Sequence, residues 1–133
     1  MREVTITRVY DAPRELVWRA WTEPERLAQW WGKRGWNAQL DSIVIDARPG
    51  GAFRVTTVNA DGAEMTTEGV FAEVVAPERL SFAGGGSVTL TELPGGRTRM
   101  VFRTTVPHAT AEGGVRSALD RLAEHLSPER TSP

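Results

Sequence analysis

The sequence has no cysteine, only two histidines and no long run of apolar residues. Without cysteine the chain can form neither a disulfide framework nor a thiolate metal site, and it has no cysteine nucleophile. His108 and His125 are too few for a multi-histidine metal site, so we expect neither a metal nor a cofactor. No window reaches the roughly 20 apolar residues of a membrane helix, and the charged N-terminus lacks the apolar core of a signal peptide. We therefore expect a cytoplasmic protein that does not enter a membrane.

The charge is close to balanced, since 16 Lys and Arg face 17 Asp and Glu and give a net charge of −1. Such a balance argues against bulk attraction to nucleic acid or to an anionic membrane. Two catalytic signatures are also missing: no serine lies in a G-x-S-x-G elbow, and the glycine run at 84–86 does not open a phosphate-binding loop. By contrast, five tryptophans lie within the first 36 residues, and side chains that large need a core, a cavity or a partner.

The patterns of the first 32 residues predict one strand and two short helices. Apolar and β-branched residues alternate over 4–10 and predict a strand, one face of which carries Val4, Ile6, Arg8 and Tyr10. Apolar residues at helical spacing predict a first helix after Pro13. Thr22 and Glu25 are spaced as a capping box and predict a second short helix, which Gly32 ends.

The rest of the chain predicts a sheet followed by a long helix. Short strands joined by tight turns favour an antiparallel sheet, and we expect these strands at 40–46, 51–58, 65–75, 79–82, 87–93 and 97–106. A closing helix is expected after Gly113-Gly114 and up to Ser127-Pro128, with a polar face that carries Arg116, Asp120, Arg121 and Glu124. The predicted fold class is therefore α+β, with one domain over 1–127 and a disordered tail over 128–133.

Four blocks of sequence together resemble a known family. They read DAPRELVWRAWTEPERLAQWWG at 11–32, DARPGGAFR at 46–54, GVFAEVVAPERLSF at 69–82 and SALDRLAEHL at 117–126. In order and spacing they resemble the bacterial homologues of the C-terminal domain of the activator of the Hsp90 ATPase, in the START-like or Bet v 1-like (SRPBCC) superfamily. The resemblance implies a helix-grip fold: a curved antiparallel sheet of about six to seven strands around the C-terminal helix, two short helices after the first strand, and an internal pocket.

The sequence departs from this family pattern in two loops. Residues 83–86, Ala-Gly-Gly-Gly, stand where the family usually has a longer hairpin with aromatic and acidic residues. Residues 113–115, Gly-Gly-Val, stand where it often has a longer loop with a Gly-Trp pair. Both changes remove bulk near the expected mouth of the pocket, so we expect a pocket that is either more open or smaller because the sheet collapses.

We expect the pocket lining to supply shape and apolar contact rather than bond making. The candidate residues are Trp21, Trp30, Trp31, Phe53, Phe71, Phe82 and Phe102, with Leu119 and Leu122 of the last helix facing them. Arg8 and Tyr10 are candidates for a polar anchor that holds a carboxylate or phenolate. Each aromatic residue is alternatively plain core, and Arg8 is alternatively paired with an acid such as Glu73 or extended to water.

Three functions are compatible with these candidates. The first is binding of an apolar or amphipathic small molecule in the cavity, without catalysis. The second is a START-related enzyme, cyclase-like or hydrolase-like, which needs convergent polar groups such as Arg8 with Tyr10 or Glu73. The third is a chaperone-associated stress-response protein that contacts Hsp90, which ranks last because the activator has a further N-terminal domain. A homodimer through an edge strand or through the tryptophan-rich helices is also open.

Overall fold

The computed structural model describes residues 2–107 and 109–126. Within these ranges the chain forms eight strands, three α-helices and one 3-10 helix, η1. In chain order the elements are β1 (Arg2–Tyr10), α1 (Arg14–Thr22), α2 (Pro24–Leu27), β2 (Trp36–Ala38), η1 (Leu40–Ser42), β3 (Val44–Ile45), β4 (Ala52–Asn59), β5 (Glu64–Val75), β6 (Arg79–Phe82), β7 (Ser87–Leu93), β8 (Arg97–Val106) and α3 (Ala109–His125).

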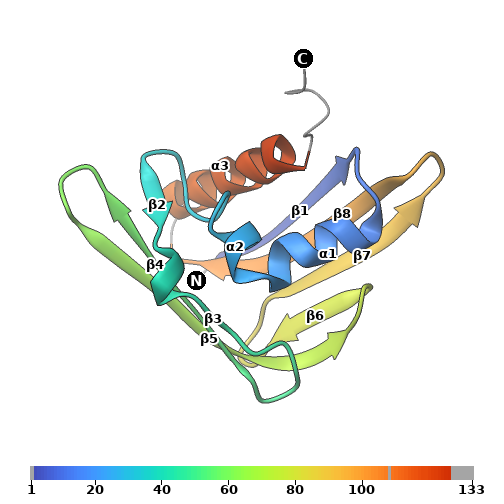
Figure 1. Cartoon of the computed structure of the whole chain (residues 1–133), viewed down its shortest axis with the longest axis horizontal. Coiled ribbons are helices and arrows are strands. Elements are labelled where there is room, and N and C mark those ends of the chain that lie inside the picture. Colours follow the sequence, from blue (N-terminus) through green and yellow to red (C-terminus); the bar gives the residue numbers. More distant parts are fainter. Residues whose placement is uncertain (1, 108, 127–133) are drawn as a thin grey trace.

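The strands form one antiparallel sheet in the order β1-β8-β7-β6-β5-β4-β2, and the two-residue β3 pairs with β4 beside this path. The first strand pairs with the last along its whole length, from Arg2 opposite Val106 to Tyr10 opposite Thr98. Figure 1 shows that the sheet curls and that all three α-helices lie on its concave side. The predicted α+β helix-grip architecture is confirmed.

The concave face of the sheet is its apolar face, because successive strand side chains point to opposite faces. In β1 the predicted alternation holds: Val4, Ile6 and Tyr10 are buried, and their neighbours in the sequence are exposed. The other strands add the buried apolar side chains Phe53, Val55, Phe71, Leu80, Val88, Leu90, Met100 and Val106. The core therefore lies between the concave face and the helices.

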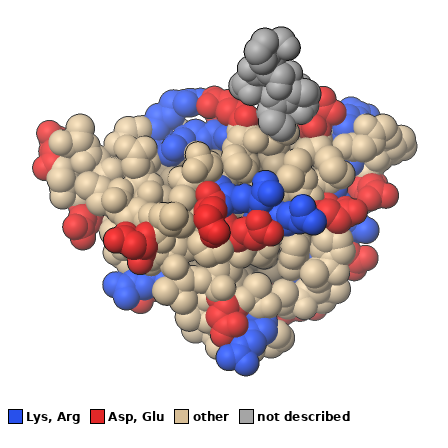
Figure 2. Space-filling model, in the orientation of Figure 1, with Lys and Arg blue, Asp and Glu red and all other residues tan. Residues whose placement is uncertain are grey.

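Helix α1 covers part of this core with one face and meets solvent with the other. It buries Val17, Ala20 and Trp21, which recur at i, i+3 and i+4. Figure 2 shows acidic and basic side chains interspersed across the middle of the opposite face, over α1 and α2. Within the described ranges, no helix combines the length and apolar character that a membrane crossing requires.

Helix α3 is tied to the concave face of β1. The Tyr10 hydroxyl donates a hydrogen bond to the Leu119 carbonyl at 3.2 Å, and burial raises the pKa of this hydroxyl, which therefore stays neutral. Two residues earlier in β1, Arg8 forms an ion pair with Asp120 at 2.6 Å. Strand residues two apart share a face, so the β1 alternation itself aims both side chains at the helix.

The junction of the first two helices differs from the prediction. The Thr22 hydroxyl donates to the Trp18 carbonyl at 2.9 Å within α1, while α2 has Glu23 as its N-cap and no side-chain cap. The predicted capping box is therefore wrong, because a threonine at a helix end can bond back to the preceding turn. Helix α2 has only four residues, and Trp30 and Trp31 follow it in a turn.

The predicted strand at 40–46 is confirmed only at 44–45 and is wrong over 40–42. Strand β2 precedes this segment, and the segment itself divides into η1 and β3. The Ser42 hydroxyl accepts a hydrogen bond from the Thr56 N–H at 3.0 Å and donates to the Gln39 carbonyl at 2.6 Å. A side chain thus satisfies backbone groups that a strand ladder would otherwise pair.

The last helix begins earlier than predicted, at Ala109, so that Gly113 and Gly114 lie inside it. Neither glycine has a positive φ, so residues with a side chain could adopt the same backbone conformation at both positions. Much of the segment expected to be a shortened loop is therefore helix. The predicted stop at Ser127-Pro128, the predicted tail at 128–133 and His108 lie outside the described residues.

Gly113→Ala is expected to raise the free energy of unfolding by about 0.5–1 kcal/mol, because glycine is the poorer helix former. Gly113 is exposed, and a Cβ built there meets no atom within 4 Å. Urea denaturation measures the change. Gly62→Ala is the control and is expected to destabilise, since Gly62 has a φ of 83°. A Gly113→Ala protein no more stable than the parent would contradict a helix at this position.

Candidate functional site

A cavity of about 460 Å³ lies between the concave face of the sheet, α1 and the N-terminal half of α3. Small-molecule sites commonly have volumes of about 300–1,000 Å³. Side chains from α1, the segment after α2, the β4–β5 hairpin, β8 and α3 converge on it. The lining residues are Trp21, Trp30, Trp31, Gly32, Lys33, Trp36, Thr57, Met65, Thr67, Phe102, Val106, Pro107, Ala111, Gly114, Val115, Ala118 and Leu119.

A continuous series of aromatic contacts begins at this cavity. The ring of Phe102 lies 5.6 Å from that of Trp21 between centroids, and Trp21 meets Trp30 edge-on at 4.9 Å. Trp31 lies 5.5 Å from Trp30 and 5.4 Å from Phe53, again with ring planes strongly inclined. Inclined arrangements place the positive edge of one ring against the negative face of the next. Trp21, Trp30 and Trp31 thus form one packed wall rather than separate contacts.

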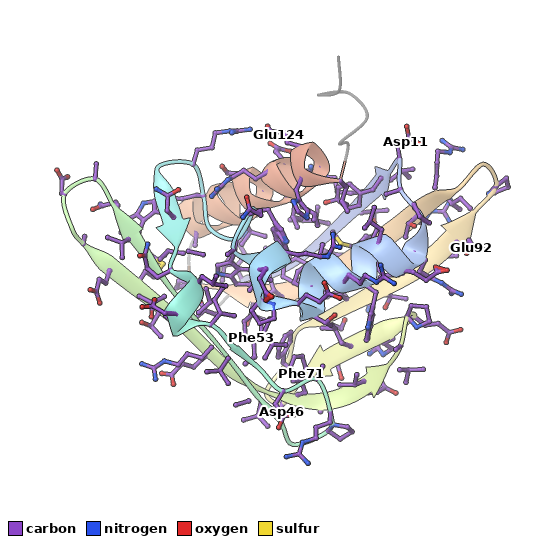
Figure 3. The ribbon with its side chains drawn as sticks, in the orientation of Figure 1. Asp11, Asp46, Phe53, Phe71, Glu92 and Glu124 are labelled. Atoms are coloured by element: carbon purple, nitrogen blue, oxygen red, sulfur yellow. The ribbon has the colours of Figure 1, made fainter. Side chains whose placement is uncertain are left out.

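The far end of this series is filled core. Phe53 lies 5.4 Å from Phe82 and 6.0 Å from Phe71, and the latter two rings stack at 5.1 Å. Figure 3 shows Phe53 and Phe71 where the sheet turns through β4 and β5, away from Glu124 on α3. Gly69 lies beside this cluster, since a Cβ there would be in van der Waals contact with the Phe82 ring at 3.4 Å. These three phenylalanines lie outside the cavity lining.

The predicted site residues therefore fall into two groups, those that line the cavity and those that lie elsewhere. It brings together in the lining Trp21, Trp30, Trp31, Phe102 and Leu119. It places elsewhere Arg8, Tyr10, Phe53, Phe71, Phe82 and Leu122. Arg8 pairs with Asp120 and not with Glu73, whose partner is Arg79 at 2.6 Å. The predicted convergence of Arg8 with Tyr10 or Glu73 inside the cavity does not occur, while contact of the lining residues with a ligand stays a prediction.

Sequence reasoning missed most of the cavity mouth. Lys33 and Trp36 enter from the segment after α2, and Ala111 and Gly114 from the first turns of α3. Trp36 belongs to the tryptophan cluster and Lys33 is the one lysine of the chain, so the composition of the sequence could have singled out both residues. The two helix residues carried no such signal, because they fall in the segment that was expected to be a loop.

Arg121 of α3 holds the segment that carries the mouth residues. Its Nη1 donates to the carbonyls of Gly32 at 2.9 Å, Trp36 at 3.0 Å and Trp31 at 3.3 Å. Burial lowers the pKa of this guanidinium. The predicted assignment of Arg121 to the solvent-facing polar side is therefore wrong, because carbonyls left without partners after a short helix attract a donor.

A second tie joins the same segment to α3. The Arg34 backbone N–H donates to the Ser117 hydroxyl at 3.1 Å. The Arg34 side chain forms an ion pair with Glu124, and the hydrogen bond that it donates to this carboxylate raises the pKa of Arg34. Together with Arg121, these contacts fix the position of Lys33 and Trp36 relative to the helix.

The polar groups of the lining are few. Besides Lys33, it contains the hydroxyls of Thr57 and Thr67, and the Thr57 hydroxyl donates to the Met65 carbonyl at 3.3 Å. The Trp21 Nε1 is buried without a hydrogen-bond partner in the described structure. Over the same ranges, no three His, Asp or Glu side chains gather as a metal site. This lining suits apolar contact with a few polar groups for orientation.

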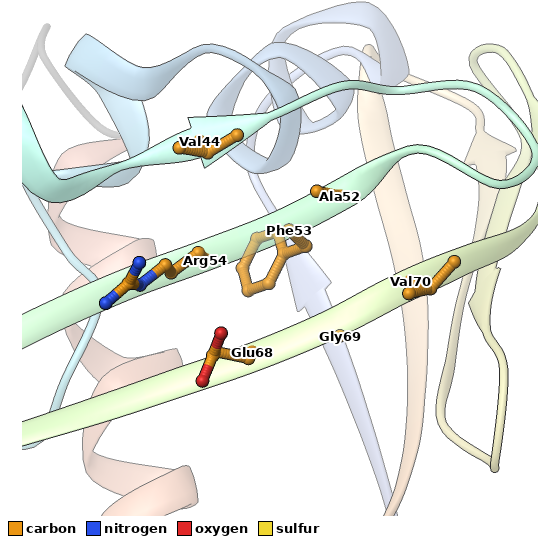
Figure 4. A pocket seen from close by; sticks show the side chains of 7 residues that line it. All are labelled: Val44, Ala52, Phe53, Arg54, Glu68, Gly69 and Val70. Atoms are coloured by element: carbon orange, nitrogen blue, oxygen red, sulfur yellow. The ribbon is translucent and has the colours of Figure 1, made fainter.

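A second depression, of about 620 Å³, lies on the outer side of β3, β4 and β5 (Figure 4). Val44 and Val70 are exposed on it, and Arg54 and Glu68 face each other across the β4–β5 pairing. Most of its walls are exposed strand side chains, and none of the described helices covers it, so this depression is open to solvent. The cavity on the concave side is therefore the candidate site.

Comparison with known proteins agrees with this architecture. The family described as "Activator of Hsp90 ATPase homolog 1-like protein" matches residues 11–127. A protein from Chromobacterium violaceum has a similar structure, with a TM-score of 0.83 and 27% identity over 96% of this chain and 99% of that chain. An AHSA1-like protein from Aeromonas hydrophila gives 0.79 and 26% over 97% and 96%. No curated protein matches the sequence significantly.

Arg121→Met is expected to lower the free energy of unfolding by about 1–3 kcal/mol, because three carbonyls lose a charged donor. Amide hydrogen exchange over 32–36 is expected to accelerate. Arg116→Met is the matched control on the same helix, since Arg116 makes only an exposed pair with Glu112 and is expected to cost less than about 1 kcal/mol. Equal stability and unchanged exchange in the Arg121 variant would contradict its role in holding the segment.

Proposed function

Because the chain belongs to the Activator of Hsp90 ATPase homolog 1-like family, we propose that it binds an apolar or amphipathic small molecule inside the helix-grip domain. The ligand occupies the cavity between α3 and the concave face of the sheet. The observation that carries this proposal is a concave space of about 460 Å³ with mostly apolar walls, which opens to solvent beside the exposed Lys33. Small-molecule sites are typically concave, mostly apolar and of this size.

The aromatic series supports this proposal. At one end Phe53, Phe71 and Phe82 pack against one another outside the cavity lining, while at the other Trp21 and Trp31 border the cavity. Rings that are packed on one side and exposed to a cavity on the other provide a rigid apolar wall. Burying a ligand against such a wall gains roughly 25 cal/mol per Å² of apolar area.

The other two functions have less support. General acid–base catalysis needs paired titratable groups at the reacting centre, and the described lining has no carboxylate and no histidine. A chaperone partner would need a docking surface. In the outer depression, exposed Val44 and Val70 lie beside the charged Arg54 and Glu68, so this depression does not offer a continuous apolar surface. The family name describes a homologue, and one fold hosts many functions. Binding in the cavity is the function we propose.

Ala118→Trp is expected to weaken binding of the neutral fluorophore N-phenyl-1-naphthylamine at least tenfold, because an indole at this lining position occupies the cavity. Fluorescence titration measures the affinity. Arg116→Trp adds the same ring to the exposed side of α3 and is expected to bind the fluorophore like the parent protein. Thermal unfolding of both variants checks that the fold is kept. Failure of the parent protein to bind the fluorophore and a panel of other neutral amphiphiles would contradict the proposed function.

A further inference from the structure

Lys33 is the one charged residue in the described lining of the cavity. Its Nζ lies 5.6 Å from the centroid of the Trp36 ring, which is a cation–π contact at an exposed position. In the part of the chain that the structure describes, no carboxylate lies within ion-pair distance of Lys33. An apolar cavity thus carries a single positive charge at its mouth.

The acidic residues of the neighbouring helix do not supply the missing partner. Each is already engaged by arginine: Glu112 by Arg2 and Arg116, Asp120 by Arg8, and Glu124 by Arg34. The remaining arginine of this region, Arg121, is directed to three backbone carbonyls. Within this set of charges, Lys33 is the cation that has no partner.

The position of Lys33 is set by the same contacts that build the mouth. Arg121 and Ser117 fix the segment on either side of it, as described above. The aliphatic stem of Lys33 lies against Gly114 of α3, where a built Cβ would be 3.5 Å from its Cδ. The stem therefore follows the apolar wall while the ammonium stays in solvent, which is the usual arrangement of a lysine at an apolar surface.

A second donor of the lining, the Trp21 indole N–H, also has no hydrogen-bond acceptor in the described structure. Trp21 is 2% exposed and its Nε1 has no hydrogen-bond partner in the described structure, whereas Nε1 of Trp30 donates to the Ala20 carbonyl at 3.0 Å. Buried donors are normally satisfied. The lining thus offers a buried indole N–H in addition to the ammonium at its mouth, and both donors are complementary to oxygen acceptors.

We propose that the ligand is an amphipathic monocarboxylate, whose apolar body fills the cavity and whose carboxylate pairs with Lys33 at the mouth. This inference rests on the proposed function, because it assigns a chemical class to the ligand of the same cavity. A single cation beside an apolar wall selects one negative charge on an apolar body, while a neutral molecule of equal size gains nothing from it.

The test compares two ligands that differ only in their polar group, 2-naphthoate and 2-naphthylmethanol. Each displaces N-phenyl-1-naphthylamine from the parent protein and from Lys33→Met, Lys33→Arg and Arg97→Met at low ionic strength. Arg97→Met removes one positive charge on the far hairpin, where Arg97 is exposed. Lys33→Met is expected to weaken naphthoate about fivefold and to change naphthylmethanol less than twofold, with the difference shrinking in salt.

The controls separate this inference from the proposal beneath it. Lys33→Arg and Arg97→Met are expected to keep the parent preference for the carboxylate. If Lys33→Met weakens both ligands equally, or neither, the inference is overturned while cavity binding stands. The same holds if the parent protein binds only the alcohol. If neither ligand nor the fluorophore binds to the folded parent protein, the proposed function itself fails.

Discussion

The packing of α3 across the concave face of the sheet is the constraint on which the rest of the structure depends. On one side, β1 holds the helix through the Tyr10 hydroxyl on the Leu119 carbonyl and through the Arg8–Asp120 ion pair. On the other side, Arg121 reaches the carbonyls of the segment that leads into β2. The helix therefore joins the two edges of a curled sheet, and the cavity is the space that this span leaves unfilled.

The aromatic residues decide where that space lies. Because the phenylalanines of β4, β5 and β6 pack into one cluster, the corner of the sheet under α2 is closed. The tryptophans continue the cluster toward α3, where the small residues Ala111, Gly114 and Ala118 line the cavity with them. Small residues opposite large ones leave a hollow instead of a filled interface. The cavity thus arises from unequal side-chain volume on facing elements.

Charge around the cavity follows a simple division. The arginines near α3 are bound to acids or to carbonyls and act as structural ties, and the exposed ion pairs among them add little stability on their own. Their larger effect is geometric, because they orient the helix and the mouth segment. The one lysine lies at the mouth, where its ammonium is 5.6 Å from the centroid of the Trp36 ring. The arginines that hold the fold are therefore different from the cation to which we assign ligand binding, Lys33.

Local patterns were sufficient for β1 and for the strands from β4 to β8. Period-two alternation and turn residues placed β6 and β8 at their observed bounds, 79–82 and 97–106, and four sequence blocks indicated the family and its helix-grip fold. Where a side chain bonded to the backbone, the same reasoning was wrong: Thr22 capped nothing, and Ser42 replaced a strand ladder. Such bonds compete with the backbone hydrogen bonds of helices and strands, and the spacing of apolar residues does not reveal them.

The sequence by itself determined the fold class, the concave face of the sheet and the set of aromatic residues that cluster. Only the tertiary structure decided which of them fill the core and which border a cavity, and that Lys33 stands at its mouth with no acidic residue of the described ranges paired to it. The physical reason is that alternation and helical spacing depend on neighbours in the chain, whereas a cavity depends on volumes contributed by α1, β8 and α3 from distant parts of it.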